Sequence, residues 1–172
     1  HIYTIQAFKR MLDEYPDLQC RLILAGDGPL LNEIKQACRS LQIAHLVDFP
    51  GFVSSSQARD LMEQAHAFLH HSVTASNGDT EGMPNAIMEA MAMELPVVST
   101  IHSGIPELVE DGVNGYLVAE KDVTAYAQKL KAIMDWPLLP ANREKIMLMC
   151  EIEGHARQLI NLYQSTLKTS PL

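Results

Sequence analysis

Hydrophobic residues recur along this chain in two alternating patterns. Apolar residues at helical spacing, together with one segment that opens on three serines, predict helices over 1–15, 30–41, 54–63, 84–94, 123–134 and 141–167. Short apolar runs bounded by Gly, Pro or polar residues predict strands over 21–25, 46–52, 67–71, 96–100 and 115–119. Because the strands alternate with helices and are apolar on both sides, we expect an α/β fold with a parallel sheet covered by helices on both faces.

Composition narrows the class of protein. The 172 residues are 47% hydrophobic and 20% charged, which is typical of one globular domain, and no linker divides residues 1–172. The net charge of −8 argues against nucleic-acid binding, which depends on clustered Lys and Arg. The longest uncharged runs, 65–78 and 95–106, are too short and polar to span a bilayer. Three dispersed cysteines without a Cys-x-x-Cys pair favour a reducing compartment, and we expect a cytoplasmic location.

Chemistry is expected in the loops that follow the strands, because ligands of open parallel sheets bind at the carboxyl ends of strands. The apolar helix predicted from Pro84 contains Glu89 in its second turn, and a buried carboxylate there would need a partner. A ribose diol is one such partner. Glu81, in the Gly-rich loop before the helix, could reach a sugar at the other end of a diphosphate. The alternative is that Glu89 is half-exposed at the sheet edge and Glu81 is simply solvated.

A metal site is not expected. The sequence contains no Asp-x-Asp pair that would supply ligands to a divalent cation beside a diphosphate. His70 and His71 are adjacent on a predicted strand, so their side chains point to opposite faces and cannot share one ion. We expect one of them to be a core histidine and His71, nearer the carboxyl end, to be able to face the site.

Five ordered blocks between residues 22 and 125 carry a family resemblance. Residues 81–92 and 95–100 resemble the Glu-x7-Glu signature of retaining nucleotide-sugar glycosyltransferases of the family-four GT-B type. The other blocks that resemble this family are 25–29, 49–53, 103–109 and 111–118. Segments 78–82 and 102–106 are similar to exopolysaccharide enzymes of the colanic-acid and amylovoran type. The resemblance implies the Rossmann-like C-terminal domain of a GT-B fold, which binds the nucleotide-sugar donor.

The resemblance also implies roles for individual residues. Glu81 would be the catalytic residue that contacts hydroxyl groups of the donor sugar, and Glu89 would bind the ribose. Backbone amides in the same block would approach the sugar and phosphates, and those amides belong to Gly82, Met83, Asn85 and Ala86. Pro84 cannot donate a hydrogen bond and would contribute shape only. Val53 would meet the nucleobase through its backbone, and Gly26 would permit close approach of the base or phosphate.

The implied reaction transfers a hexose from a nucleotide-diphospho sugar, with a UDP-sugar favoured, to a polysaccharide or lipid-linked oligosaccharide. The resemblance implies no metal and no other cofactor. Contact with a membrane would be peripheral, at the inner face of the plasma membrane, through the acceptor or an N-terminal domain. Two alternatives remain open: a nucleotide-binding or interaction module without transferase activity, and a nucleotide-sugar epimerase.

The chain departs from the family pattern in its cations. No Lys or Arg lies between Arg59 and Lys121, and the family's basic pair, first strand and acceptor domain would all precede His1. We therefore expect a gap between the strands at 21–25 and 67–71, and an isolated chain that is inactive. The helical tail of the domain, residues 141–172, would then expose its apolar stripe.

Overall fold

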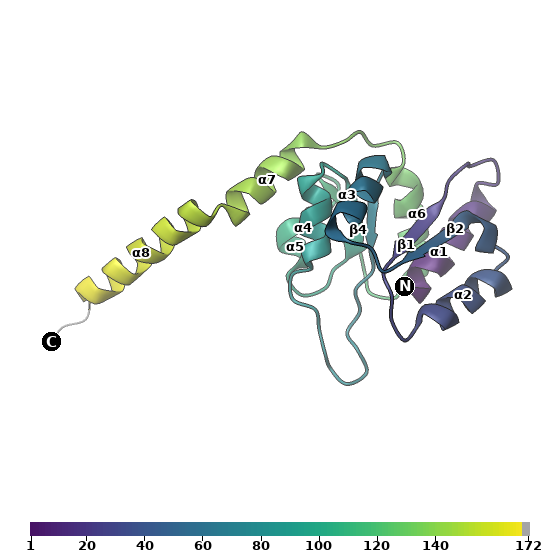
Figure 1. Ribbon diagram of the computed structural model, residues 1–172, viewed down its shortest axis with the longest axis horizontal. Helices are drawn as coiled ribbons and strands as arrows, with labels where there is room; N and C mark the ends of the chain where they lie inside the picture. Colours follow the sequence, from purple (N-terminus) through teal and green to yellow (C-terminus); the bar gives the residue numbers. More distant parts are fainter. Residues whose placement is uncertain (170–172) are drawn as a thin grey trace.

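The computed structural model describes residues 1–169, except the side chains of residues 153, 155 and 166–169 (Figure 1). Parallel strands form two sheets, one of β1 (Leu22–Ala25) and β2 (Val47–Gly51), the other of β3 (Phe68–His70), β4 (Val97–Thr100) and β5 (Gly115–Val118). The predicted parallel α/β fold is confirmed. The expected gap is also present, because β1 and β3 belong to separate sheets.

Helices cover both faces of the three-stranded sheet, as the apolar strands require. The helices α1 (Ile2–Glu14) and α6 (Val123–Ile133) pack together on one face, where Val98 joins their core. On the other face lie α4 (Asn85–Ala92), α5 (Ile105–Leu108) and α7 (Pro140–Cys150), with Val97 in their core. Val97 and Val98 are both fully buried, so β4 is covered on both sides.

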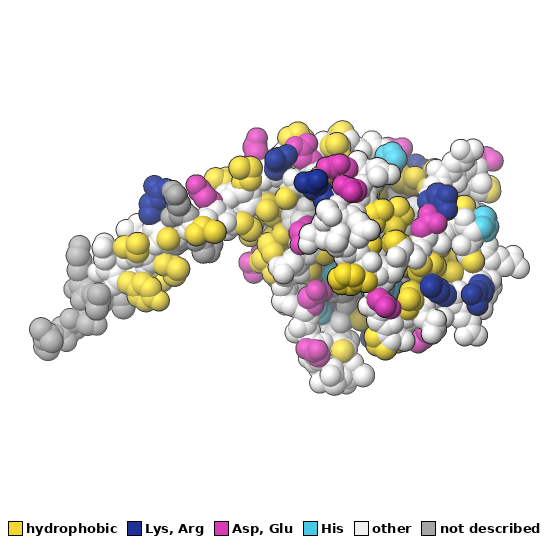
Figure 2. Space-filling view, in the orientation of Figure 1, with side chains coloured by type: hydrophobic (Ala, Val, Ile, Leu, Met, Phe, Trp, Pro, Cys, Tyr) yellow, Lys and Arg dark blue, Asp and Glu magenta, His cyan; other side chains and the backbone are white. Residues whose placement is uncertain are grey.

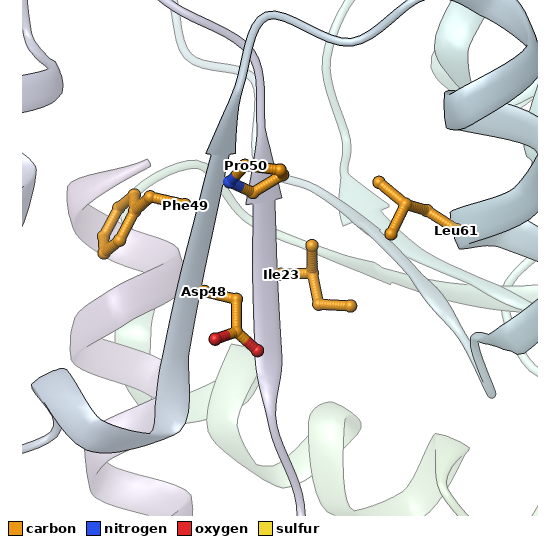
Figure 3. A pocket seen from close by; sticks show the side chains of 5 residues that line it. All are labelled: Ile23, Asp48, Phe49, Pro50 and Leu61. Atoms are coloured by element: carbon orange, nitrogen blue, oxygen red, sulfur yellow. The ribbon is translucent and has the colours of Figure 1, made fainter.

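The two-stranded sheet is less completely covered. Its flanking helices are α2 (Leu31–Ser40) and α3 (Ser55–Gln64), and α3 begins with a capping box between Ser54 and Gln57. Ile23 of β1 and Leu61 of α3 point toward each other across an open pocket of about 310 Å³ (Figure 3). Ile23 remains 42% exposed, so this face of the sheet is not part of the core.

Most predicted elements are present with ends shifted by one or two residues. Two short elements were missed, the 3₁₀ turn η1 (Ala44–Leu46) and α5. The prediction of one continuous helix over 141–167 is wrong, because extended backbone at Glu151 separates α7 from α8 (Ile152–Thr169). Residues 170–172 of the predicted tail lie outside the described part of the chain.

The tail exposes apolar side chains, as the sequence predicted. Helix α8 extends away from the sheets in Figure 1, and Figure 2 shows hydrophobic side chains along α7 and α8. The large exposed ones are Met147, Leu148, Ile152, Leu159, Ile160, Leu162 and Tyr163. Within residues 1–169, none of the helices combines the length and the apolar character needed to cross a bilayer.

Candidate functional site

The longest loop of the sheet, residues 71–84, joins β3 to α4 and carries Glu81 (Figure 1). Its first residues are fixed to β4, because Thr100 Oγ1 donates to the carbonyl of Ser72 at 2.8 Å. Its last residues are fixed to the loop after β4, because Gly104 N donates to the carbonyl of Gly82 at 3.1 Å. A Cβ at Gly104 would lie 3.2 Å from that carbonyl oxygen, so glycine permits this close approach.

Glu81 is held by two neighbours. Its Oε2 accepts hydrogen bonds from His70 Nε2 at 2.9 Å and from Ser72 Oγ at 2.8 Å. Partial burial raises the pKa of Glu81, but these hydrogen bonds outweigh it, and the net pKa lies below the ordinary value. The carboxylate is therefore ionised and oriented, and its side chain is still 47% exposed, so that a ligand can reach it. The view of Glu81 as a simply solvated residue is wrong.

The two histidines take the opposite places from those expected. His70 lies on the face of β3 that carries Phe68, which leads toward α4, and from there it reaches Glu81. His71 packs between Tyr3 and Tyr126, with ring centroids 5.1 and 4.8 Å away. The two rings point to opposite faces, as strand alternation requires. His71 is therefore the core histidine, and His70 is the one that faces the site.

Glu89 is not a buried carboxylate. Its residue is exposed on α4, although Ile87, Ala90 and Met91 of the same helix are buried. The argument that burial demands a partner for Glu89 is therefore wrong, and the alternative of an exposed position at the edge is closer to the structure. Exposure leaves the carboxylate accessible to a ligand, so the ribose assignment stays a prediction.

The backbone between the two glutamates leads into the amino terminus of α4. Buried Pro84 is the N-cap, one position earlier than the sequence suggested, and Asn85 is the first helical residue. The first amides of a helix have no partner within it and carry a partial positive charge. Those of Asn85 and Ala86, four and five residues after Glu81 in the sequence, therefore offer anion-binding groups, while Met83 and Gly82 lie in the loop just before them.

Gly26 and Val53 lie on the other sheet, after β1 and β2. Gly26 has φ +132°, a conformation that other residues rarely adopt, and its N–H donates to the carbonyl of Gly51 at 2.8 Å. Beside it is a second pocket of about 410 Å³, which also includes Leu24, Ile34 and Phe49. Its size lies within the range of small-ligand pockets. Val53 is half-buried, two residues after the end of β2.

A second carboxylate at the same edge was missed from the sequence. Glu120, just after β5, accepts hydrogen bonds from His102 Nδ1 at 2.6 Å and from the amide and hydroxyl of Thr74 at 3.0 and 3.1 Å. These bonds, the one from His102 first, lower the pKa of Glu120 to about 2. A polar residue directly after a predicted strand was the available signal. Within residues 1–169, no group of three or more His, Cys, Asp or Glu residues could hold a metal ion.

The sequence and the fold correspond to a known class. The family model described as "Glycosyl transferases group 1" matches residues 1–135, and the chain belongs to that family. It is 36% identical over 168 residues to the putative colanic acid biosynthesis glycosyltransferase WcaL of Escherichia coli, covering 94% of this chain and 41% of that protein. It is 43% identical over 104 residues to the amylovoran biosynthesis glycosyltransferase AmsK of Erwinia amylovora, covering 60% of this chain and 26% of that protein.

A solved structure shows the same fold. The crystal structure of HepE from Anabaena, in complex with UDP, matches 93% of this chain and 44% of its own, with a TM-score of 0.66 and 25% identity. The predicted Rossmann-like GT-B fold class is thereby confirmed. The chain spans about two fifths of the length of WcaL, so the activity of a whole protein is a matter of proposal.

Proposed function

We propose that this chain is the donor-binding domain of a retaining glycosyltransferase that transfers a hexose from a UDP-sugar. One observation carries the proposal: along the chain, the hydrogen-bonded Glu81 precedes the amino terminus of α4, and the accessible Glu89 follows it in the second turn of the helix. Such a terminus attracts phosphate, and each carboxylate can accept hydrogen bonds from sugar hydroxyls. The sites therefore follow the order sugar, diphosphate, ribose along the chain.

Each residue has a role in this arrangement. Glu81 accepts hydrogen bonds from hydroxyls of the donor sugar, and Glu89 accepts them from the ribose. The amides of Gly82, Met83, Asn85 and Ala86 approach the sugar and diphosphate, and Pro84 shapes the turn. Gly26 and Val53 contact the base, and the pocket beside Gly26 offers space for it.

The transfer breaks the bond between the anomeric carbon and the diphosphate oxygen. The nucleoside diphosphate leaves with the electron pair, and the acceptor hydroxyl oxygen forms the new bond on the same face of the sugar. The products are the glycosylated acceptor, the nucleoside diphosphate and one proton. The oxocarbenium-like transition state gains from fixed dipoles near the leaving phosphate, such as the α4 terminus, without a metal ion.

Acceptor binding and part of the diphosphate binding are not accounted for by these residues. Because the chain spans about two fifths of WcaL, we propose that the acceptor site and the diphosphate-binding cations lie in other parts of the protein. The acceptor is then a polysaccharide or lipid-linked oligosaccharide, which brings a cytoplasmic enzyme to the inner face of the membrane. The names of WcaL and AmsK support exopolysaccharide synthesis, and the UDP complex of HepE supports UDP as the nucleotide of the donor. The isolated chain is expected to bind the donor without transferring it.

The test is nucleotide binding by the intact protein, measured by calorimetry with UDP, GDP and ADP. Glu89→Ala removes charge-assisted hydrogen bonds to the ribose, and we expect the Kd for UDP to rise about tenfold or more. Glu144→Gln, an exposed carboxylate on α7, is the control and should leave the Kd unchanged.

Four outcomes would contradict parts of the proposal. An unchanged Kd in Glu89→Ala would refute the ribose assignment. Tighter binding of GDP or ADP than of UDP would refute uracil as the base of the donor. Binding without any donor consumption by the intact protein would favour a nucleotide-binding module, and loss of activity in EDTA would refute metal independence.

A further inference from the structure

Two segments outside residues 81–89 have left-handed backbone that is not explained by the end of a helix. Among the described residues, four non-glycine residues have positive φ: Gln42, Glu94, Ser103 and Lys121. The first two follow the ends of α2 and α4, where such a residue closes a helix. The amides that follow them bond back to Cys38 and Ala90, as that closing motif requires.

Helix closure does not explain Ser103 and Lys121. Ser103, at φ +46°, directly follows His102, and Lys121, at φ +64°, directly follows Glu120. Non-glycine residues keep this conformation only where surrounding contacts enforce it. Both members of the His102–Glu120 hydrogen bond are therefore followed by strained backbone that the local contacts maintain.

The contacts of Glu120 join three loops. His102 comes from the loop after β4, Glu120 from the loop after β5, and Thr74 from the loop after β3. An ionised carboxylate can only accept, so His102 Nδ1 carries the proton of the 2.6 Å bond. His102 is only 4% exposed, and its Nε2 has no hydrogen-bond partner in the part of the chain that the structure describes. The bond to Glu120 thus satisfies the one ring nitrogen of His102 that has a partner there.

The backbone beside Glu120 is also fixed. Lys121 N donates to His71 Nε2 at 3.1 Å, which ties the loop to the end of β3. Glu120 can therefore act as an anchor for the more exposed Thr74.

These contacts reach Glu81 from both directions. Thr74 precedes Glu81 in the same loop and is held by Glu120. Gly82 follows Glu81 and is held by Gly104, two residues after His102. Displacement of the His102 ring would therefore disturb the attachment of the loop on both sides of Glu81.

We propose that Glu120 is a positioning residue that, through His102 and Thr74, fixes the loop presenting Glu81 and so governs discrimination among donor sugars. This inference rests on the proposed donor-binding function. Glu120 need not touch the sugar nucleotide, because the three hydrogen bonds that it accepts all come from protein groups.

The first test needs no ligand. In Glu120→Gln the charge is lost, and one of the two oxygens that together accept from His102 and Thr74 becomes an amide NH2, which cannot accept. Amide exchange across 72–83 should therefore accelerate about tenfold or more. Glu110→Gln makes the same chemical change at an exposed position before β5 and should leave exchange unchanged. Thr74→Val, which removes one hydroxyl and keeps the shape, serves if Glu120→Gln fails to fold, and should accelerate exchange in the same segment. Unchanged exchange in the folded variants would overturn the inference.

The second test separates positioning from general destabilisation. The kcat/KM ratio for UDP-glucose against UDP-galactose is measured in the intact wild type and in each variant. Glu120→Gln should move this ratio toward one by about fivefold or more, while the Kd for UDP stays within about twofold. In a Glu81→Gln background the same change should have no further effect on the ratio, because both act through one group.

The outcomes distinguish the two proposals. A wild-type protein that binds no UDP and consumes no donor refutes the proposed function, whatever the exchange data show. A wild type that discriminates between the sugars, with a Glu120→Gln variant that discriminates equally well, refutes the role of Glu120 alone. Equal loss of rate with both sugars would also refute it, because that is the result of a merely structural defect.

Discussion

At the scale of single residues, the state of Glu81 depends on two donors that stabilise its ionised form. We predict that Ser72→Ala raises the pKa of Glu81, because it removes the 2.8 Å hydrogen bond to Oε2. If the ionised carboxylate binds the sugar, the acidic limb of the kcat/KM profile shifts to higher pH. A carbon-detected NMR titration of the Glu81 carboxyl group reports the pKa without any substrate.

The matched control is Ser76→Ala, at an exposed position of the same loop. It should leave both the titration and the pH profile unchanged. An unshifted Glu81 titration in Ser72→Ala would show that the hydrogen bond does not control ionisation. A shifted titration with an unshifted rate profile would show that Glu81 ionisation does not limit the reaction.

The sequence could single out Glu81 and Glu89 as candidates because both lie in one continuous signature. Their environments were harder to predict, since the exposure of Glu89 depends on which side of α4 meets the sheet. Strand alternation separated His70 from His71 correctly but did not show which face leads to α4. Glu120 and Thr74 are 46 residues apart and joined only by the fold, so local patterns gave no indication of their contact.

At the scale of elements, β5 depends on a residue without a side chain. A Cβ at Gly115 would lie 2.2 Å from the carbonyl oxygen of Val97 and 2.8 Å from Val109 Cγ1. We predict that Gly115→Ala lowers the free energy of unfolding by about 1–3 kcal/mol or more, because backbone of β4 must move. Denaturant unfolding measures this. Gly28→Ala, where a Cβ meets nothing within 4 Å, should change it little, and equal stability of the two variants would contradict the prediction.

Element types were predictable where the hydrophobic pattern was long, and not where it was short. Helix α5 spans only Ile105–Leu108, which is too few residues for helical periodicity to show. The tail has apolar residues at helical spacing across Glu151, so the pattern gave no sign that extended backbone there separates α7 from α8. Serine caps did locate the start of α3, because capping acts through adjacent residues.

At the scale of the whole molecule, His71 lies where α1, β3 and α6 meet. Its ring stacks on Tyr3 of α1, meets the edge of Tyr126 of α6 and accepts a hydrogen bond from Lys121 N. Burial lowers the pKa of His71 from 6.5 to about 4. Protonation of this one ring therefore opposes the packing of both helices on the sheet, and global stability should respond to it.

The sign of the response follows from proton linkage. Between pH 6.5 and about 4 the unfolded chain binds a proton at His71 more readily than the folded chain, so folding stability is full above this window and falls as the pH drops through it. Glu120, with its pKa lowered from 4.5 to about 2, adds a second loss below pH 4.5.

We predict that His71→Asn flattens the slope of unfolding free energy against pH between 6.5 and 4.5, whatever it does to absolute stability. Denaturant unfolding at closely spaced pH values measures that slope. His66→Asn, at an exposed position before β3, should leave the slope as in the wild type. A full slope in His71→Asn would mean that the acid sensitivity arises elsewhere. A wild-type slope that begins only below pH 4.5 would assign the acid sensitivity to carboxylates such as Glu120, because His71 contributes from pH 6.5 downward and Glu120 only below pH 4.5.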